Sequence, residues 1–223
     1  MKTMPKSKLP AFQRARQPDQ IKQREEAILQ AALALFEEKG LENVTLGDIA
    51  ARVGTATSNL YRYFESREHI YLRTVQRLAG EWEQRVIPPL EKLKDKGTLP
   101  KVIAIFAESY LKSPQYGELI TVANAVLEKK LTASLVIDFR TVFLERRKRL
   151  ARVLAAALPG VTFEKLFPLT LHLFVHVPGL WPFCHPTRAS KRMLQDPQYA
   201  HLNLDFKVEI SRFLEVFFKG MLG

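Results

Sequence analysis

The sequence has very little cysteine, no long uninterrupted apolar run and almost no strand pattern. Its single cysteine, Cys184, excludes an internal disulfide, so nothing points to an oxidising compartment. We find no run of about 18 apolar residues, which predicts that no helix spans a membrane. The basic first 24 residues lack the apolar core of a secretory signal. These absences favour a cytoplasmic globular protein.

Motifs that support catalysis are also missing. The chain has no Gly-rich phosphate loop, no nucleophile elbow and no carboxylates clustered at helical spacing. We therefore expect neither an enzyme activity nor a cofactor.

Acidic residues are in deficit, and the deficit is uneven. Among 223 residues, 34 Lys and Arg face 23 Asp and Glu, a net charge of +11. Such a surplus favours an anionic partner. Residues 1–24 contain seven basic residues and one acidic residue. With Pro5, Pro10 and Pro18, residues 1–18 are predicted to form a basic flexible arm, which either follows DNA phosphates or is a solubilising tail.

What the sequence does have is helical periodicity in nearly every segment. Apolar residues recur three and four apart around Ile28–Phe36, Leu135–Leu158 and Phe206–Met221. We also expect a helix cap at Thr132 and breaks at Pro88-Pro89, Pro159-Gly160 and Pro178-Gly179. The fold class is therefore predicted to be all-α, with about nine helices.

The segment from Thr45 to Phe64 is the most informative. Thr45 with Asp48 three residues later predicts a capped helix start, and Gly54 predicts its left-handed end. Thr55 or Thr57 can then cap a second helix, on which Leu60 and Phe64 face inward. A short helix, a glycine turn and a second helix with a polar outer face form a helix-turn-helix, whose second helix fits a DNA major groove.

These residues resemble a known family. Ile28-Leu29, Ala31-Ala32, Gly40, Thr45, Ile49-Ala50, Gly54, Leu60-Tyr61 and Ser66-Arg67-Glu68 are similar to the N-terminal domain of the tetracycline-repressor (TetR) family of bacterial transcription regulators. The resemblance implies a three-helix DNA-binding domain at residues 19–65. It further implies a larger helical ligand-binding and dimerisation domain at residues 66–223.

We assign DNA-contact roles on this basis. Tyr61 and Tyr63 match the family's phosphate-contacting positions, although core packing is an alternative for both. Arg67 is expected to hold a phosphate, and Thr45 to offer a phosphate its hydroxyl and backbone N–H. The candidates for base edges are Thr57, Ser58 and Arg62, while Asn59 either reads an adenine or caps a helix. Thr55, whose hydroxyl can cap the second helix, is also counted among the candidate DNA-contact residues.

The resemblance implies that residues 66–223 dimerise and enclose a small-molecule pocket. Dimerisation is also indicated by Leu204–Leu222, where apolar residues cover more than one helix face. The candidate pocket residues are Trp82, Phe106, Tyr110, Asn124, Phe143, His172 and His176. The two histidines, four apart, have three interpretations: structural or interface residues, hydrogen-bond donors to the ligand, or metal ligands together with Cys184 or His185. We predict no metal site.

The preferred function is a homodimeric repressor that binds a palindromic operator in double-stranded DNA and is released by a small apolar or aromatic effector. The alternative is a basic helical protein that binds a partner or a membrane surface without reading DNA sequence. The arm and the cluster Arg146-Arg147-Lys148-Arg149 motivate this alternative. A solvated helix face is the simpler interpretation of the cluster.

Overall fold

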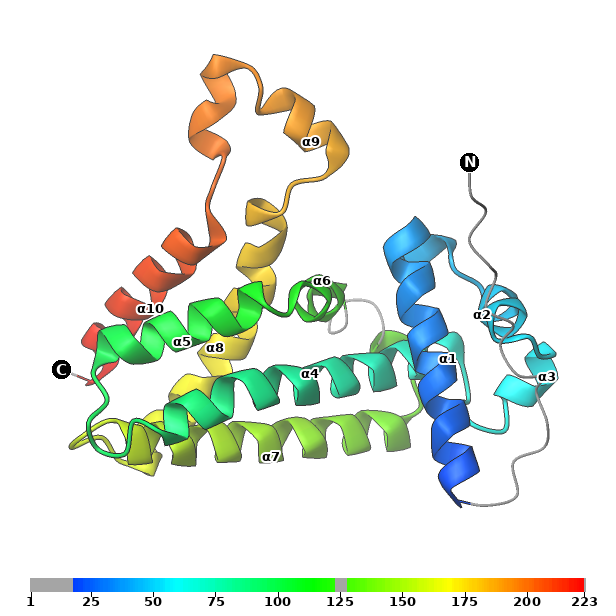
Figure 1. The fold of residues 1–223 in the computed structure, drawn as a ribbon, viewed down its shortest axis with the longest axis horizontal. Coiled ribbons are helices and arrows are strands. Elements are labelled where there is room, and N and C mark those ends of the chain that lie inside the picture. Colours follow the sequence, from blue (N-terminus) through cyan, green and yellow to red (C-terminus); the bar gives the residue numbers. More distant parts are fainter. Residues whose placement is uncertain (1–17, 123–127, 223) are drawn as a thin grey trace, which may run out of the picture. The chain divides into compact units, whose positions relative to one another are not determined.

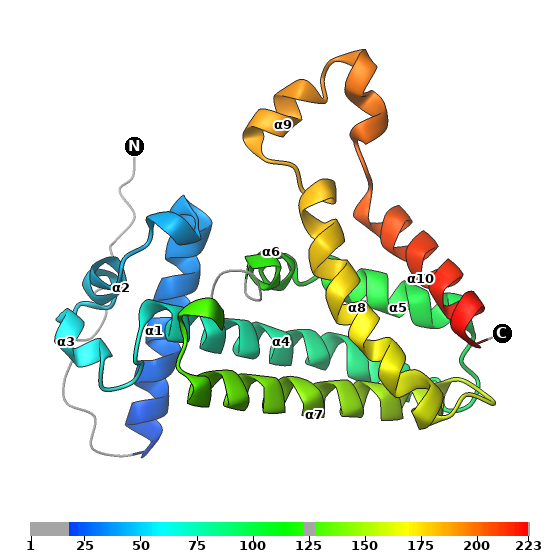
Figure 2. The same cartoon turned by 180° about the vertical axis from the view of Figure 1, so that it is seen from behind.

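The structure, a computed structural model, describes residues 18–122 and 128–222. Every element in those ranges is a helix (Figures 1 and 2), as the periodicity predicts. They are α1 (Pro18–Lys39), η1 (Leu41–Asn43), α2 (Leu46–Val53), α3 (Thr57–Leu60), α4 (Arg67–Glu91), α5 (Leu99–Leu111), α6 (Pro114–Val122), η3 (Glu128–Lys130), α7 (Ala133–Ala157), α8 (Phe163–Cys184), α9 (Arg188–Met193), η4 (Pro197–Leu202) and α10 (Phe206–Leu222).

The described residues divide into two compact units, and the division falls inside α4. The first unit contains residues 18–74 together with 128–131, and the second contains residues 75–122 and 132–222. The sequence places the boundary at residue 65, nine residues earlier. The first turns of α4 belong to the first unit because Ile70 and Tyr71 are fully buried and the Tyr71 hydroxyl donates to the Ala32 carbonyl at 3.1 Å.

The first unit has its core between α1, α2 and the start of α4. Ile28, Ala32 and Leu35 form the buried side of α1, and Ile49 and Ala50 form that of α2. Burial of these side chains supplies most of the stability of such a small unit. Gly40, at φ 76°, ends α1 where the sequence predicts a stop.

The second unit packs six longer helices around aromatic side chains. In both views α4 and α7 run side by side, as do α8 and α10 (Figures 1 and 2). α7 begins after Thr132 as predicted, although that side chain makes no capping hydrogen bond, and it ends one residue before Leu158. Gly160, at φ 74°, then turns the chain toward α8.

Two predicted helix breaks are wrong, because prolines lie inside α4 and α8. α4 continues through Pro88 and Pro89, and α8 contains Pro168, Pro178 and Pro182. A proline in a helix removes one N–H donor and leaves the carbonyl four residues earlier without its partner. At Pro182 that carbonyl belongs to Pro178. The Thr121 hydroxyl of α6 lies 3.3 Å from it and shares its one proton with the Gly117 carbonyl, which is closer at 2.8 Å. A neighbouring helix therefore compensates only in part for the lost bond.

α8 is relevant to the expectation that no helix spans a membrane. By length and composition this helix alone, among the described residues, qualifies as membrane-spanning. One of its faces is buried in the second unit, through residues that include Leu166, Leu173 and Trp181. A core helix of a soluble protein meets the same criterion, and packing within the second unit accounts for one face of α8.

Candidate functional site

The start of α2 is fixed by a reciprocal cap. The Thr45 N–H and hydroxyl both donate to the Asp48 carboxylate at 2.7 Å, and the Asp48 N–H donates to the Thr45 hydroxyl at 3.1 Å. These bonds, together with Lys39 at 3.0 Å from the carboxylate, lower the pKa of Asp48 to about 2. The capping box is confirmed. However, the two Thr45 groups that we assigned to a phosphate are already bonded within the protein.

The turn after α2 also follows the prediction. Gly54 adopts a left-handed conformation, φ 76° and ψ 39°, and its N–H reaches the Ala50 and Ala51 carbonyls. The Thr55 N–H donates to the Ala50 carbonyl at 2.9 Å. This arrangement satisfies the last carbonyls of α2 and fixes the angle at which the chain enters α3.

The cap of α3 differs from the prediction. Ala56 occupies the N-cap position, and neither Thr55 nor Thr57 makes the capping bond. Instead the Thr55 hydroxyl accepts a 2.9 Å hydrogen bond from the Asn59 side-chain amide. Of the two roles left open for Asn59, the structure therefore favours the internal one.

The remaining candidates of this segment face solvent to different degrees. Ser58, Tyr61 and Arg62 are exposed, while Thr57 and Tyr63 are half-buried. Tyr61 has 60% of its surface exposed, which rules out core packing for its ring within the first unit. Leu60 and Phe64 are buried as predicted, so the segment has an inner apolar side and an outer polar side.

Arg67, for which we predict a phosphate contact, is bonded within the first unit. Its guanidinium donates to the Val44 carbonyl at 2.6 Å and to the Leu41 carbonyl at 3.3 Å. A third hydrogen bond, 2.8 Å long, goes to the carboxylate of Glu68, which lies 3.6 Å from the ammonium of Lys130. The side chain is mostly covered and connects the start of α4 to the segment before α2. These bonds favour a role for Arg67 in positioning α2.

His69 is a positioning residue that sequence reasoning missed. Its Nδ1 accepts the Glu65 N–H at 3.2 Å, and its ring packs edge-on against Phe64 with centroids 5.3 Å apart. Burial lowers the pKa of His69, and nearby Arg73 adds to the effect. The position shows no pattern in sequence, because the contact depends on the turn between α3 and α4.

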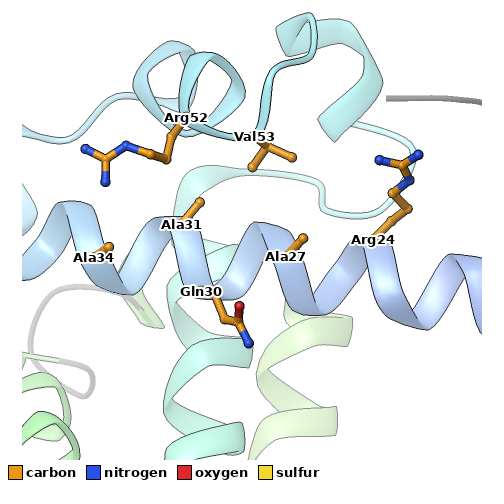
Figure 3. A pocket seen from close by; sticks show the side chains of 7 residues that line it. All are labelled: Arg24, Ala27, Gln30, Ala31, Ala34, Arg52 and Val53. Carbon is orange, nitrogen blue, oxygen red and sulfur yellow. The ribbon is translucent and has the colours of Figure 1, made fainter. Parts of the chain in front are cut away.

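A groove of about 270 Å³ lies along the surface of the first unit (Figure 3). Ala27, Ala31 and Ala34 form its floor on α1, and their small side chains leave the space open. Arg52, at its rim, is held by the Glu38 carboxylate at 2.6 Å. The groove involves none of the residues predicted to contact DNA.

In the second unit, Trp82, Phe106 and Tyr110 come together as predicted, and all three are buried. The Trp82 ring lies 4.9 Å from Tyr110 and 5.9 Å from Tyr116, and its Nε1 donates to the Ser109 hydroxyl at 2.9 Å. Burial raises the pKa of Tyr110 well above its usual range. In the structure these rings form a packed aromatic core.

Next to this core is a small cavity with Phe143 in its wall. Tyr116, Phe143 and Phe174 contribute rings to it, and its volume of about 20 Å³ is room for about one water molecule. Arg146 is the charged residue of its lining. The guanidinium lies 3.0 Å from the Glu83 carboxylate and donates to the Gln76 carbonyl at 2.9 Å. Arg146 is therefore already paired with a carboxylate, which also lies 4.0 Å from Arg149.

Two predicted pocket residues lie elsewhere, and the position of a third is not described. Asn124 is outside the described residues. His172 and His176 are exposed, which corrects their assignment to an interior pocket. Their rings pack on α10, against Phe217 at 5.3 Å and Phe213 at 3.7 Å respectively. No group of three or more potential metal ligands is found in the described part of the chain.

The basic cluster of α7, Arg146-Arg147-Lys148-Arg149, is bonded largely to other groups of the second unit. Arg147 donates to the Thr170 hydroxyl and the Phe167 carbonyl, and its guanidinium lies 4.8 Å from the Phe167 ring. Lys148 pairs with Glu145 at 2.7 Å. Together with the Arg146 contacts, this arrangement removes the main reason for proposing an anionic membrane partner here.

α8 and α10 each carry a second apolar stripe that the described residues leave largely uncovered. On α10, Phe206, Ile210, Leu214 and Phe218 are buried, while Phe213, Val216, Phe217 and Met221 are half-buried or exposed. On α8, the outer stripe contains Leu171, His172, Val175, His176 and Phe183, all exposed. The two His–Phe ring contacts join these stripes into one surface, which we call the outer face.

Comparison with known proteins gives the family. A family model described as "Bacterial regulatory proteins, tetR family" matches residues 28–74, and one described as "Tetracyclin repressor-like, C-terminal domain" matches residues 76–223.

Curated relatives match over short stretches. The regulator YvdT of Bacillus subtilis is 34% identical over 71 residues, covering 28% of this chain and 37% of the relative. The repressor KstR2 of Mycolicibacterium smegmatis is 32% identical over 83 residues, covering 34% and 40%. The chain thus spans about two fifths of the length of these relatives.

Solved structures are similar over most of the chain. A transcriptional regulator from Rhodococcus sp. RHA1 has a TM-score of 0.59 at 17% identity, covering 88% of this chain and 96% of that one. A TetR/AcrR-family regulator from Thermobifida fusca has a TM-score of 0.54 at 20% identity, covering 86% and 96%. These likenesses concern the fold, whereas the family models match nearly all of residues 28–223. The chain therefore belongs to the TetR family of DNA-binding transcriptional regulators.

Proposed function

We propose that this protein is a homodimeric repressor that binds a palindromic operator and is released from it by an uncharged, largely apolar small molecule. It would act in the cytoplasm, where the operator is. The observation that carries the proposal is that some polar side chains of the helix-turn-helix are exposed while others are bonded within the first unit. Ser58 on the second helix of the helix-turn-helix, and Tyr61 and Arg62 in the turn after it, are exposed. Asn59 and Arg67, in contrast, are bonded within the unit.

Base recognition is assigned to the exposed residues of α3 and the turn after it. Arg62 suits a guanine, because a guanidinium can donate to both acceptors on the major-groove edge of that base. Thr57 and Ser58 are adjacent in sequence and are assigned to neighbouring bases. The hydroxyls of Tyr61 and Tyr63 are assigned to phosphates, to which they can donate hydrogen bonds. The basic arm at residues 1–18 adds non-specific attraction to DNA.

The start of α2 offers a phosphate site different from the one predicted. The first amides of a helix have no partner within it. Since Thr45 takes up the Asp48 amide, the amides of Leu46 and Gly47 are the donors left for a phosphate. The Lys39–Asp48 ion pair limits repulsion from the carboxylate.

Dimerisation is assigned to the outer face of α8 and α10. A side chain such as Val216, 70% exposed, is costly to leave in water next to three other apolar residues. Gly179 and Gly220 lie on the same stripes, and a Cβ added to either would meet nothing in the chain. Small residues allow a second helix to approach closely. Two such helices from each subunit would form a four-helix interface.

The chemistry of the effector follows from the cavity beside Phe143. Its lining is aromatic and aliphatic, and its one cation, Arg146, is already paired with Glu83. An anionic ligand would have to displace that carboxylate, so the expected ligand is neutral. Because about 20 Å³ cannot hold such a ligand, binding must move the surrounding helices. α4 continues from this cavity to Arg67 and so links effector binding to the position of α2.

The test of the whole proposal is selection of DNA from a pool of genomic fragments. We expect the recovered fragments to share a palindrome whose half-sites are about one helical turn apart, about 34–36 Å. A library of neutral hydrophobic compounds is then titrated into the complex, and at least one should release the DNA. Fragments with no shared palindrome would refute sequence-specific binding.

The dimer is tested separately by light scattering. The native protein should have twice the chain mass, and replacement of both Phe213 and Phe217 by Asp should give monomers or insoluble protein. A native monomer that still binds the palindrome would contradict the proposed interface.

A further inference from the structure

The chain between α8 and α10 forms a projecting segment, residues 185–205, which we call the α8–α10 arm. It contains α9 and η4, and in both views these lie beyond the ends of α8 and α10, away from the other helices of the second unit (Figures 1 and 2). Ala189 aside, whose side chain is not described, no residue from 182 to 205 is buried. The arm therefore lacks a core of its own.

The arm is nevertheless ordered by specific local bonds. The Thr187 hydroxyl accepts the Ser190 N–H at 3.2 Å and so caps α9, and the Asp196 carboxylate accepts the Gln198 N–H at 3.0 Å at the start of η4. At its base, His185 stacks on Trp181 with ring centroids 3.8 Å apart. A segment of this length loses much backbone entropy on ordering, and two caps cannot offset that loss without buried apolar surface.

Apolar surface is available on the arm, but it faces solvent. Met193, Tyr199 and Leu202 are 40%, 37% and 45% exposed, and Phe183, just before the arm, is 69% exposed. Phe183 falls seven residues after His176, so it lies on the outer stripe of α8. The exposed side chains of the arm thus continue the outer face without a break in sequence.

We propose that the α8–α10 arm crosses to the second subunit of the dimer and packs against it through Met193, Tyr199 and Leu202. This inference rests on the proposed dimerisation through the outer face. A two-fold interface places the same surface of two chains together, so an arm that extends from one end of the outer face meets the other subunit. Both arms are buried in the same way, which compensates for the cost of ordering them.

Arg188, Lys191 and Arg192 give α9 a positive charge, and DNA is therefore the competing occupant. DNA contact would use these cations but would leave Tyr199 and Leu202 in water. A second copy of the chain accounts for the apolar residues as well, which is why we favour it.

The test is photo-crosslinking in the full-length protein with p-benzoylphenylalanine placed at Tyr199 or, in a separate variant, at Val216. Irradiation should give a covalent dimer on denaturing gels from both variants. A third variant, with the probe at exposed Tyr61 in the first unit, is the control and should give none without DNA. Peptide mapping of mixed dimers, one subunit isotope-labelled, should place the Tyr199 crosslink on the other subunit.

The outcomes separate the two proposals. A covalent dimer from Val216 but not from Tyr199 would overturn the arm inference and leave the dimer intact. If palindromic DNA is added and the probe at position 199 crosslinks only to that DNA, the arm inference is also overturned. Crosslinking only within the same subunit has the same consequence. No dimer from either position, with a single-chain mass in light scattering, would overturn both.

A second measurement uses the dissociation constant of the dimer. Replacing both Tyr199 and Leu202 by Ser should raise it about 10- to 100-fold, since each dimer loses these apolar contacts twice. The matched control replaces exposed Gln195 and Ala200 by Ser and should leave it unchanged. Equal dissociation constants for the two double variants would count against the inference.

Discussion

The helix-turn-helix segment of the first unit, Thr45–Phe64, and the second unit differ in how far apart in sequence their decisive contacts are. In the first unit, the cap at Thr45 and the bond from Asn59 to Thr55 join residues three and four apart. In the second unit, the contacts that determine the core join residues many positions apart, such as Trp82 to Ser109 and Arg146 to Gln76. The first kind can be inferred from a sequence pattern, and the second kind depends on the fold.

The difference also suits the functions proposed for the two units. A DNA reader must present the same side chains in every molecule, so local bonds that fix them are useful. A ligand-responsive unit needs an alternative arrangement of its helices, and contacts between distant segments are the ones that such a change would alter. We therefore expect substitutions in the two units to impair stability and DNA binding in different ways.

The largest effect is expected at the crossing of α6 and α8 in the second unit. A Cβ on Gly117 would lie 2.4 Å from the buried ring of Trp181, and neither can move without disturbing its neighbours. Gly117→Ala should lower the free energy of unfolding by about 3 kcal/mol. The midpoint of thermal unfolding should fall by roughly 6–12 °C.

The matched control is Gly80→Ala in α4, whose Cβ would make an ordinary 3.6 Å contact with Arg146. This variant should gain up to about 1 kcal/mol from helix propensity. Stabilisation of the chain by Gly117→Ala as well would mean that α6 and α8 are not as close as described.

Sequence reasoning succeeded for features that depend only on residues within about one helical turn of each other. The capping box at Thr45, the left-handed Gly54 and the inward Leu60 and Phe64 were all predicted. The fold class was predictable too, since helical periodicity runs through nearly the whole chain. The family resemblance added the expectation of a second helical domain, and the family model for residues 76–223 bears it out.

Sequence reasoning failed where a distant partner changes what a residue does. Arg67 was taken for a DNA contact because its positive charge is visible in sequence and the carbonyls of Leu41 and Val44 that accept its bonds are not. Pro178 was taken for a helix break because the packing that buries Val177 and Trp181 on either side of it depends on other helices. His172 and His176 have the right spacing for a site, but the α10 rings place them outside the interior.

The next effect compares two arginines of the first unit. Arg67→Ala leaves two carbonyls without donors and should lower the free energy of unfolding by about 1–3 kcal/mol, with weaker binding to every DNA sequence. Arg62→Ala should leave unfolding unchanged and relax the preference at one base pair by roughly 1–3 kcal/mol. Chemical denaturation and a panel of operator variants measure the two quantities. If Arg67→Ala unfolds like the native protein, its positioning role is wrong.

A smaller effect is expected in the salt dependence of DNA binding. With two to four cations engaged per subunit, the logarithm of the binding constant should fall against the logarithm of salt concentration with a slope of roughly −4 to −7 for a dimer. Removing residues 1–17 should make the slope shallower by about 0.9 for each lost phosphate contact. Arg67→Ala should leave the slope unchanged, because its charge is used within the protein. An identical slope for the truncated protein would assign the arm to solubility alone.

The smallest effect is expected at Asp48, and it tests whether the local bonds of the first unit contribute to its stability. The pKa of this carboxyl is about 2 in the folded protein, below its ordinary value of 3.8, because Thr45 and Lys39 favour the ionised form. A lowered carboxyl pKa contributes stability that is complete above about pH 4 and is lost as the pH falls through 2.

Asp48→Asn keeps an acceptor for Thr45 but cannot titrate. In urea unfolding between pH 5 and 2, as set by those two pKa values, the native protein should therefore lose its advantage over the variant as the solution is acidified. Other carboxyls, such as Glu38 and Glu68, titrate equally in both proteins, so the difference isolates Asp48. A difference that stays constant over this range would mean that the cap acts through hydrogen-bond geometry, with no contribution from the charge.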